Sequence, residues 1–304
     1  YTLKTILIAG GSGLVGTRIT ELLDSTEYRI IILTRFPKPP KGNITYLYWD
    51  IDKGVIDDRA LYADYLINLT GDGIADSRWT TKRKKILIDS RVNGTLLIQS
   101  AMKKANRKFK AAVSASAIGY YGDQGDTILD ERNNPGDEFL STCCLLWENA
   151  SEQLQEVADY NRIVRVGLVL STRGGALPKI LMTKTVRLFN YFGNGKQYYS
   201  WIHIDDISRM FIHLLTEPSD HFVYNGVAPR PLTNKKFTEE VRDAIGYGIV
   251  LPAPALGLKI ALGEMSNVVL NSNRVLPKNF GEVGFRFEYP DLTNAIKDLL
   301  DREV

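Results

Sequence analysis

A run of glycines near the N-terminus is the first group of residues that could do chemistry. Gly10, Gly13 and Gly16 recur at every third position, directly after the apolar residues 6–9 and before an amphipathic helical pattern. Glycines so placed allow a tight turn, a close approach of the backbone to a pyrophosphate, and close packing of helix on strand. The free N–H groups at the start of the helix attract an anion. We therefore predict a phosphate-binding turn formed by Gly10, Gly11, Ser12, Gly13, Leu14, Val15 and Gly16.

Small hydroxyls and two phenols form the second group. Ser116, Tyr120 and Tyr121 follow a predicted strand at residues 110–114. A doubly wound sheet binds its ligand at the carboxyl ends of its strands, and hydroxyl groups there can orient a substrate oxygen or transfer a proton. We predict that these three residues contact a substrate carbonyl. An ordinary Ser/Gly/Tyr loop is the alternative.

The cofactor prediction depends on the residues that close the second predicted strand, 28–34. Thr34 and Arg35 stand there, without an acid. A carboxylate at this place would accept the ribose hydroxyl of NAD, whereas a guanidinium accommodates the 2′-phosphate of NADP. We therefore predict NADP(H), with a solvated arginine at a strand end as the alternative. Asp50, after the strand at 44–49, could accept the adenine amino group or could be a turn acid.

The elements that must position these groups alternate between strands and helices. Further strands are predicted at 65–71, 110–114 and 163–170, and helices at 81–104 and 138–159. This alternation predicts an α/β fold with a Rossmann-type doubly wound parallel sheet. Leu69, Thr70 and Gly71 end a strand at the same edge as the glycine turn and are predicted cofactor contacts. Asn93 and Gly94 are unfavourable in mid-helix, which indicates a kink or a side chain directed at something specific.

The alternation of strands and helices loosens after Gly174, which predicts a smaller C-terminal α+β lobe. Residues 180–192 are predicted to be helical, and 199–206 to be a strand that leads into a helix capped by Asp205. We expect residues 1–170 to form an NADP-binding Rossmann domain, with 200–225 returning to it, and residues 171–304 to form a substrate-binding lobe.

Composition limits the classes of binding partner and the cellular location that we expect for this protein. The 304 residues carry a net charge of +3 and no dense basic stripe interleaved with aromatics, so no nucleic acid is expected. The basic run 82–85 is interpreted as a solvated helix face. No apolar run is long enough to span a bilayer, so no membrane partner is expected. Two adjacent cysteines, Cys143 and Cys144, exclude a disulfide framework, and no metal site is expected. The cytoplasm is the expected location, and a leader ahead of Tyr1 stays an open alternative.

Six runs of residues carry a resemblance to a known family: 68–80, 90–95, 114–122, 201–206, 263–265 and 274–278. With them the sequence resembles the extended short-chain dehydrogenase/reductases of the NAD-dependent epimerase/dehydratase superfamily, and more narrowly their atypical "epimerase family" branch. The resemblance implies NADP(H), a cleft between two lobes, and a small-molecule substrate such as a nucleotide sugar. It adds Arg91 and Ser114 to the predicted cofactor-binding residues. A homodimer is an open option, because members of the wider family often pair through two helices.

The sequence departs from the wider family at its catalytic pair. Working members use a Tyr-x-x-x-Lys pair, in which the lysine lowers the pKa of the tyrosine so that the phenolate can act as a base. Aligned on Glu148, these two positions hold Leu140 and Cys144, and residues 138–159 contain no Tyr or Lys. Ser116 fits the family's serine.

Two residues near Ser116 offer a replacement for the missing phenol. Tyr120 or Tyr121 could supply it, with Lys196 or Arg165 as the cationic partner. Cys144 lies among apolar neighbours and is interpreted as a small buried residue, and His203 as a packed structural residue.

Two hypotheses about function follow. The first is an NADP(H)-dependent oxidoreductase or nucleotide-sugar epimerase that uses Ser116 with Tyr120 or Tyr121. The second is a cofactor-binding sensor or partner-binding protein with weakened hydride chemistry, a class that fits the cell-division label sometimes given to the branch.

Overall fold

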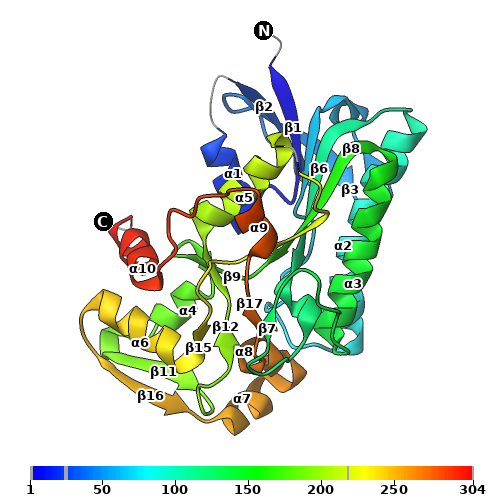
Figure 1. Cartoon of the computed structure of the whole chain (residues 1–304). Helices are drawn as coiled ribbons and strands as arrows, with labels where there is room; N and C mark the ends of the chain where they lie inside the picture. The colour runs from blue at the N-terminus through cyan, green and yellow to red at the C-terminus, as the bar shows by residue number, and fades with distance from the viewer. Residues whose placement is uncertain (1–2, 24–26, 218, 303–304) are drawn as a thin grey trace.

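An eight-stranded sheet forms the centre of the computed structural model, which describes residues 3–23, 27–217 and 219–302 (Figure 1). Neighbouring strands are parallel except the β3–β4 pair at one edge. Across the sheet the strands are β14 (Val223–Gly226), β8 (Ala158–Val166), β6 (Phe109–Ala117), β5 (Tyr65–Asn68), β1 (Lys4–Ala9), β2 (Tyr28–Thr34), β3 (Ile44–Asp50) and β4 (Val55–Ile56). The chain runs outward from β1 in one direction and then from β5 in the other. The strand order therefore reverses between β1 and β5, where such sheets bind ligands.

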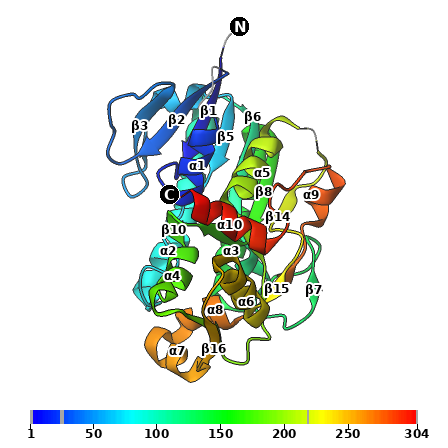
Figure 2. The same ribbon diagram turned by 90° about the vertical axis from the view of Figure 1, so that its left-hand side faces the viewer.

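Helices cover both faces of this sheet (Figures 1 and 2). One face carries α1 (Leu14–Leu22) and α5 (Ile204–Thr216), and the other carries α2 (Thr81–Lys104) and α3 (Phe139–Glu152). Successive residues of β1 point to opposite faces. Ile6 and Ile8 join the core under α1 and α5, whereas Leu7 and Ala9 join a separate core under α2. The predicted α/β class with a doubly wound parallel sheet is confirmed.

The shorter elements lie mostly below the carboxyl edge of the sheet, as Figure 1 shows. Their strands are β7 (Ile128–Leu129), β9 (Leu168–Ser171), β10 (Gly174–Gly175), β11 (Leu188–Phe192), β12 (Tyr198–Tyr199), β13 (Trp201–His203), β15 (Leu232–Thr233), β16 (Ile249–Ala253) and β17 (Arg274–Val275). Their helices are α4 (Leu177–Leu181), α6 (Asn234–Ile245), α7 (Ala255–Leu262), α8 (Asn267–Leu270), α9 (Lys278–Glu282) and α10 (Leu292–Asp301). Short 3-10 turns connect them, among them η2 (Ile118–Tyr121), η4 (Lys184–Val186) and η5 (Gly263–Ser266).

The predicted strand 163–170 is two strands in different sheets. β8 ends at Val166 and lies in the large sheet, whereas β9 begins at Leu168 and pairs with β10 and β13. Gly167 makes the change of sheet possible, because a Cβ there would lie 2.6 Å from the carbonyl oxygen of Ser200 and 2.7 Å from Val227.

Three other predictions about local structure need correction. The predicted helix at 180–192 is wrong, since its second half is β11, which pairs in parallel with β16. The helix predicted at 138–159 is α3, which ends at Glu152. Asp205 does not cap α5: the N-cap is His203, whose ring Nδ1 accepts the N–H of Asp205 at 3.0 Å.

Among the described helices, none combines the length and the apolar character needed to cross a bilayer.

Candidate functional site

The glycine turn joins β1 to α1 as the spacing predicts. Gly10 has a φ of +77°, and a Cβ there would lie 2.5 Å from the carbonyl oxygen of Leu69. A Cβ at Gly16 would lie 2.7 Å from the oxygen of Gly10. The helix begins after Gly13, and no side chain of the described residues caps it. The first N–H groups of α1 therefore face outward over a backbone cradle, an arrangement that binds an anion.

A cavity of about 550 Å³ opens at the switch point and is lined by several of the predicted cofactor-binding residues. Those that line it are Gly10, Ser12, Thr34, Arg35, Asp50, Thr70 and Gly71. Gly11, Gly13, Leu14, Val15, Gly16, Leu69, Arg91 and Ser114 do not line this cavity.

Arg35 is exposed at the rim of this cavity and forms no ion pair with any residue that the structure describes. Its neighbour Phe36 also lines the cavity and is 76% exposed. An unpaired guanidinium beside an exposed aromatic ring is available to a phosphate and a flat base.

Asp50 also lines the cavity, but its carboxylate is occupied. Oδ1 accepts the N–H groups of Asp52 and Lys53 at 3.1 and 3.2 Å, and Oδ2 pairs with the Lys53 ammonium at 3.0 Å. The turn-acid alternative describes this geometry better than an adenine contact.

Arg91 and Ser114 support the cavity from behind. The Arg91 guanidinium donates to the carbonyl oxygens of Leu87 and Asp72 at 2.8 and 3.0 Å and lies under Gly71. Ser114 is fully buried, and its hydroxyl accepts a long hydrogen bond from Asn68. Both positions hold the loop that follows β5 rather than face the open space.

The structure also explains the polar residues in the middle of α2. The helix continues through them without a break, and Asn93 lines the cavity. Gly94 allows α2 to approach the loop after β5, because a Cβ there would lie 2.5 Å from Thr70. The lining residues that sequence reasoning missed are Leu33, Phe36, Trp49, Ile51, Asp52, Asp72, Ile86, Asp89 and Ser90.

The basic run at the start of α2 is only partly a solvated face. Arg83 is mostly covered, and its guanidinium pairs with Asp72 at 2.7 Å, in the loop next to Gly71. Lys84 pairs with Glu264 of η5 at 2.5 Å, so that the N-terminus of α2 contacts the C-terminal part of the chain.

The second predicted group, Ser116, Tyr120 and Tyr121, lies together in the structure, and all three residues are buried. The Ser116 hydroxyl is 2% exposed and donates to Glu148 Oε1 at 2.7 Å. Arg165 donates to both oxygens of Glu148, from Nε at 2.8 Å and from the terminal nitrogen at 2.9 Å. In the sequence Glu148 serves only to align the helix with the wider family, and no local signal shows that Arg165 would pair with it.

The proposed phenolate role is not supported for Tyr121. Its ring is fully buried, and its hydroxyl donates to Asn225 at 2.8 Å while accepting from Arg165 at 3.0 Å. Burial raises the pKa of Tyr121 to about 12, which is the opposite of what a base near neutral pH needs. Tyr120 lies with its ring 3.5 Å from the Arg165 guanidinium, and burial raises the pKa of Tyr120 too.

The environment of the two cysteines does not favour a reactive thiolate. Both are buried, and burial raises the pKa of Cys144 to about 12, so that its thiol stays protonated near neutral pH. The structural interpretation of Cys144 agrees with this environment. Lys196, the other suggested cationic partner, is exposed and does not contact either tyrosine.

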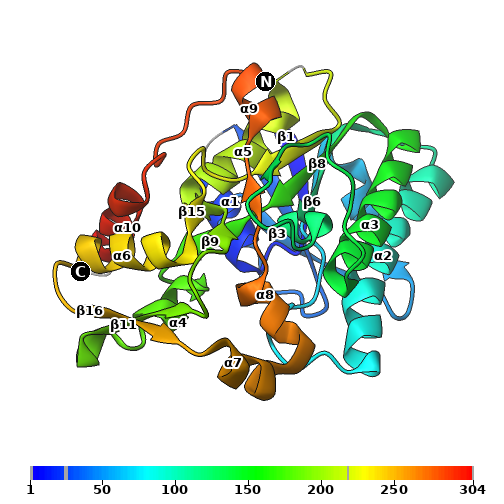
Figure 3. The same cartoon turned by 60° about the horizontal axis from the view of Figure 1, so that its bottom comes forward.

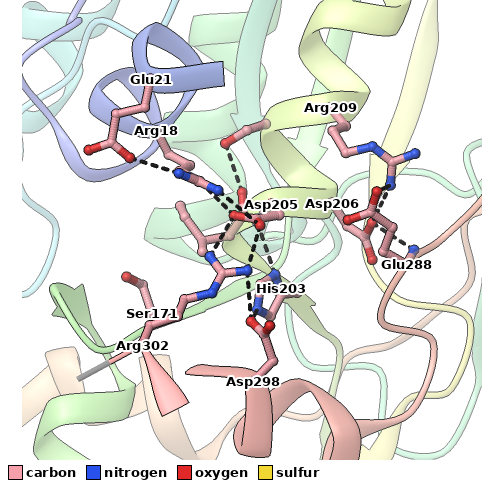
Figure 4. A network of polar contacts seen from close by, with 12 residues as sticks. Arg18, Glu21, Ser171, His203, Asp205, Asp206, Arg209, Glu288, Asp298 and Arg302 are labelled. Carbon is pink, nitrogen blue, oxygen red and sulfur yellow. Dashed lines mark hydrogen bonds and ion pairs between the residues drawn. The ribbon is translucent and has the colours of Figure 1, made fainter. Parts of the chain in front are cut away.

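A second cavity of about 480 Å³ adjoins the glycine turn beside a charged network (Figure 4). At the centre of the network lies Asp205, whose carboxylate receives Arg18 Nε at 2.7 Å and a terminal nitrogen of Arg302 at 2.7 Å. Burial alone would raise the pKa of Asp205, but these hydrogen bonds outweigh it and hold the pKa well below the usual range. The network ties α1, α5 and α10 together next to the phosphate-binding turn.

His203 belongs to the same network and predicts how stability depends on pH. Its ring is fully buried, and its Nε2 lies 3.1 Å from Asp298. Burial lowers the pKa of His203 to about 4. The unfolded chain binds this proton below about pH 6.5 and the folded chain does not, so folding stability should fall as the pH drops from 6.5 towards 4. The lost stability amounts to about 3 kcal/mol.

Urea unfolding at neutral pH and near pH 4.5 measures this dependence. We expect His203→Gln to reduce it, because glutamine does not titrate, and His213, whose pKa burial also lowers, to account for what remains. Equal slopes in wild type and His203→Gln would contradict the assignment.

Fold and site together define a protein with a nucleotide-binding Rossmann-type fold. The chain belongs to the NAD dependent epimerase/dehydratase family, whose model matches residues 6–225, and residues 253–299 match a domain of unknown function, DUF1731. The resemblance predicted from the sequence is thereby confirmed.

Curated relatives extend over nearly the whole chain. It is 31% identical over 293 residues to "Epimerase family protein Mb2239" of Mycobacterium bovis, covering 96% of both chains. It is 32% identical over 303 residues to "Epimerase family protein YfhF" of Bacillus subtilis, covering 98% of this chain and 99% of that one.

Among solved structures, human epimerase family protein SDR39U1 with NADPH superposes with a TM-score of 0.87 at 29% identity, covering 98% of this chain and 99% of the other. A nucleoside-diphosphate sugar epimerase from Corynebacterium glutamicum superposes with a TM-score of 0.77 at 28% identity, over 98% of this chain and 58% of that one.

Proposed function

We propose that this protein binds NADP(H) at the switch point of the sheet. The observation that carries the proposal is Arg35, an unpaired guanidinium at the rim of the cavity where β2 ends without an acid. The uncapped start of α1 offers its N–H groups to the pyrophosphate, and Phe36 offers an aromatic face to the adenine. A relative of this family, SDR39U1, has been crystallised with NADPH.

We further propose that residues 171–304 hold a small-molecule substrate, for which a nucleotide sugar is the leading candidate, and that the protein is an oxidoreductase or epimerase. When bound, the nicotinamide would supply hydride transfer. The chain's own contribution is to bind and orient, because Tyr121 is buried with its hydroxyl already paired and cannot move a proton to a substrate. Of the predicted catalytic set, Tyr120 is the phenol that retains some exposed surface, at 9%.

The sealed hydroxyl of Ser116 favours the second function, a cofactor-binding sensor or partner-binding protein. Ser116 donates its proton to Glu148 and is covered, so that it offers no donor to a substrate carbonyl. Incubation with NADP⁺ and a panel of nucleotide sugars, and with NADPH and their keto forms, separates the two functions. A change in absorbance by the reduced cofactor, or an epimerised sugar, supports the enzyme, and tight binding without either supports the sensor.

Calorimetric titration with NADPH and NADH tests the cofactor assignment. We expect tighter binding of NADPH, and we expect Arg35→Asp to weaken it at least about 100-fold, because the guanidinium that pairs with the 2′-phosphate becomes a repelling carboxylate. NADH binding should change little.

Arg29→Asp is the matched control, since Arg29 is an exposed arginine of β2, the strand that Arg35 follows, and does not line the cavity. Equal losses in the two variants would show that overall charge, and not the site, governs affinity. Equal affinity of wild type for the two cofactors would overturn the assignment to NADP(H).

A further inference from the structure

Large apolar side chains are exposed at the end of the molecule opposite the N-terminal strand. This end is built by β11, β16 and α7, with α4 and η4 next to them (Figure 3). The exposed fractions of the side chains run from 44% to 75%. We call them the apolar surface, which consists of Met182, Val186, Ile249, Leu251, Leu256 and Ile260.

The fold does not bury these side chains. Ile249 and Leu251 alternate along β16 with Val250, which packs against the core, so the two exposed residues share the outer face. Leu256 and Ile260 lie one turn apart on α7, none of whose eight residues is buried. A cluster of exposed apolar residues of this kind marks a surface that contacts something else.

The charged residues in the two stretches of chain that form the apolar surface are all positive. Residues 174–204 and 244–263, which contain the apolar surface, include no Asp or Glu. Neither cavity described above is lined by the apolar surface. The cations closest to it in sequence form no ion pair with any residue in the described ranges: Lys179, Lys184, Arg187 and Lys259.

We propose that the apolar surface rests on an anionic lipid bilayer. A bilayer surface has an apolar acyl layer under a layer of phosphate headgroups. Exposed apolar side chains can enter the acyl boundary, and the unpaired cations beside them can contact the anionic headgroups. A second copy of the chain fits less well, because a two-fold contact would place the same unpaired cations against one another. The expectation of no membrane partner rested on the lack of a spanning segment, which a protein lying on the membrane does not need.

Vesicle co-sedimentation with the full chain tests this proposal. We expect binding to phosphatidylcholine vesicles that contain about a third phosphatidylglycerol to be at least about tenfold tighter than to pure phosphatidylcholine, and to weaken in high salt. The double variant Leu256→Ser/Ile260→Ser should bind at least about tenfold more weakly. Lys259→Gln should weaken binding about fivefold, which corresponds to about 1 kcal/mol for one cation near the headgroups.

Two matched controls lie elsewhere on the surface. Ile128→Ser removes an apolar residue that is 54% exposed on β7, and Lys236→Gln removes an exposed cation of α6. Neither should change vesicle binding. Thermal melting reports whether each variant is folded, and the exposed positions of α7 should leave the midpoint unchanged.

Three outcomes would overturn the proposal. The first is absence of binding to anionic vesicles by the folded wild type. The second is equal weakening by the controls and by the variants of the apolar surface. The third is a dimer in sedimentation equilibrium that the α7 double variant dissociates while vesicles are not bound, which would assign the surface to a second copy.

Discussion

Replacing Glu148 with alanine should destabilise the folded protein by about 3–5 kcal/mol, because it leaves the Arg165 guanidinium buried without its counter-charge. The side chains of Arg165 and Glu148 are only 4% and 10% exposed, and the pair is joined by two hydrogen bonds. Burial alone would lower the pKa of Arg165, but Glu148 raises it above its usual value, so the arginine cannot shed its charge. In thermal unfolding the midpoint should drop by on the order of 10 °C.

Two comparisons isolate this effect. Glu156→Ala removes the carboxylate of an exposed pair with Lys103, whose atoms are 2.6 Å apart, and should leave the midpoint nearly unchanged. The double variant Glu148→Ala/Arg165→Met removes both charges and should recover part of the loss. A single variant at Glu148 that behaves like Glu156→Ala would show that water reaches Arg165.

The buried pair of Arg165 and Glu148 changes the role that we assign to Ser116. By residue type and position the serine fits a role in orienting a substrate oxygen, and the sequence predicts that role. In the structure its hydroxyl proton is directed at Glu148, and the same carboxylate is held by Arg165. The residue that fits the family's serine therefore belongs here to a buried polar cluster, which favours binding over proton chemistry.

Local pattern predicts the Rossmann half of the chain well. The predicted strand at 28–34 and the predicted helix at 81–104 have the bounds of β2 and α2. Continuous apolar runs, glycine spacing and helix periodicity are all signals from neighbouring residues, and the cavity residues from Gly10 to Gly71 follow from strand ends. These features need no knowledge of distant contacts.

The errors arise where residues far apart in the sequence decide the structure. Residues 188–192 form a strand because Ile249–Ala253 pairs with them, and their own pattern of basic and apolar residues is equally typical of a helix. Tyr121 is five residues from Ser116, but its environment is set by Asn225. His203 caps α5 in place of Asp205 because its ring is fixed by Tyr289 and Asp298. Residue type and spacing carry no information about such partners.

Replacing Gly10 with alanine should damage both folding and cofactor binding. The φ of +77° strains any residue with a side chain, and the new Cβ would lie 2.5 Å from the carbonyl oxygen of Leu69. That carbonyl cannot move freely, because the N–H of Leu69 bonds to Ala9 at 2.8 Å where β5 leaves β1. We expect a loss of about 2–5 kcal/mol in urea unfolding, from strain and overpacking together. The affinity for NADPH should fall at least about 100-fold, because the shifted backbone no longer fits a pyrophosphate.

Gly54→Ala separates the strain from the clash. Gly54 has a φ of +64°, close to that of Gly10, but a Cβ there would meet nothing within 4 Å. This variant should lose about 1 kcal/mol from backbone strain alone and should bind NADPH as wild type does. If both variants lose the same stability and both keep their affinity, the contact between Gly10 and Leu69 does not shape the phosphate-binding turn. If only Gly10→Ala loses affinity, the close approach of the two backbones at the switch point is what forms the cradle.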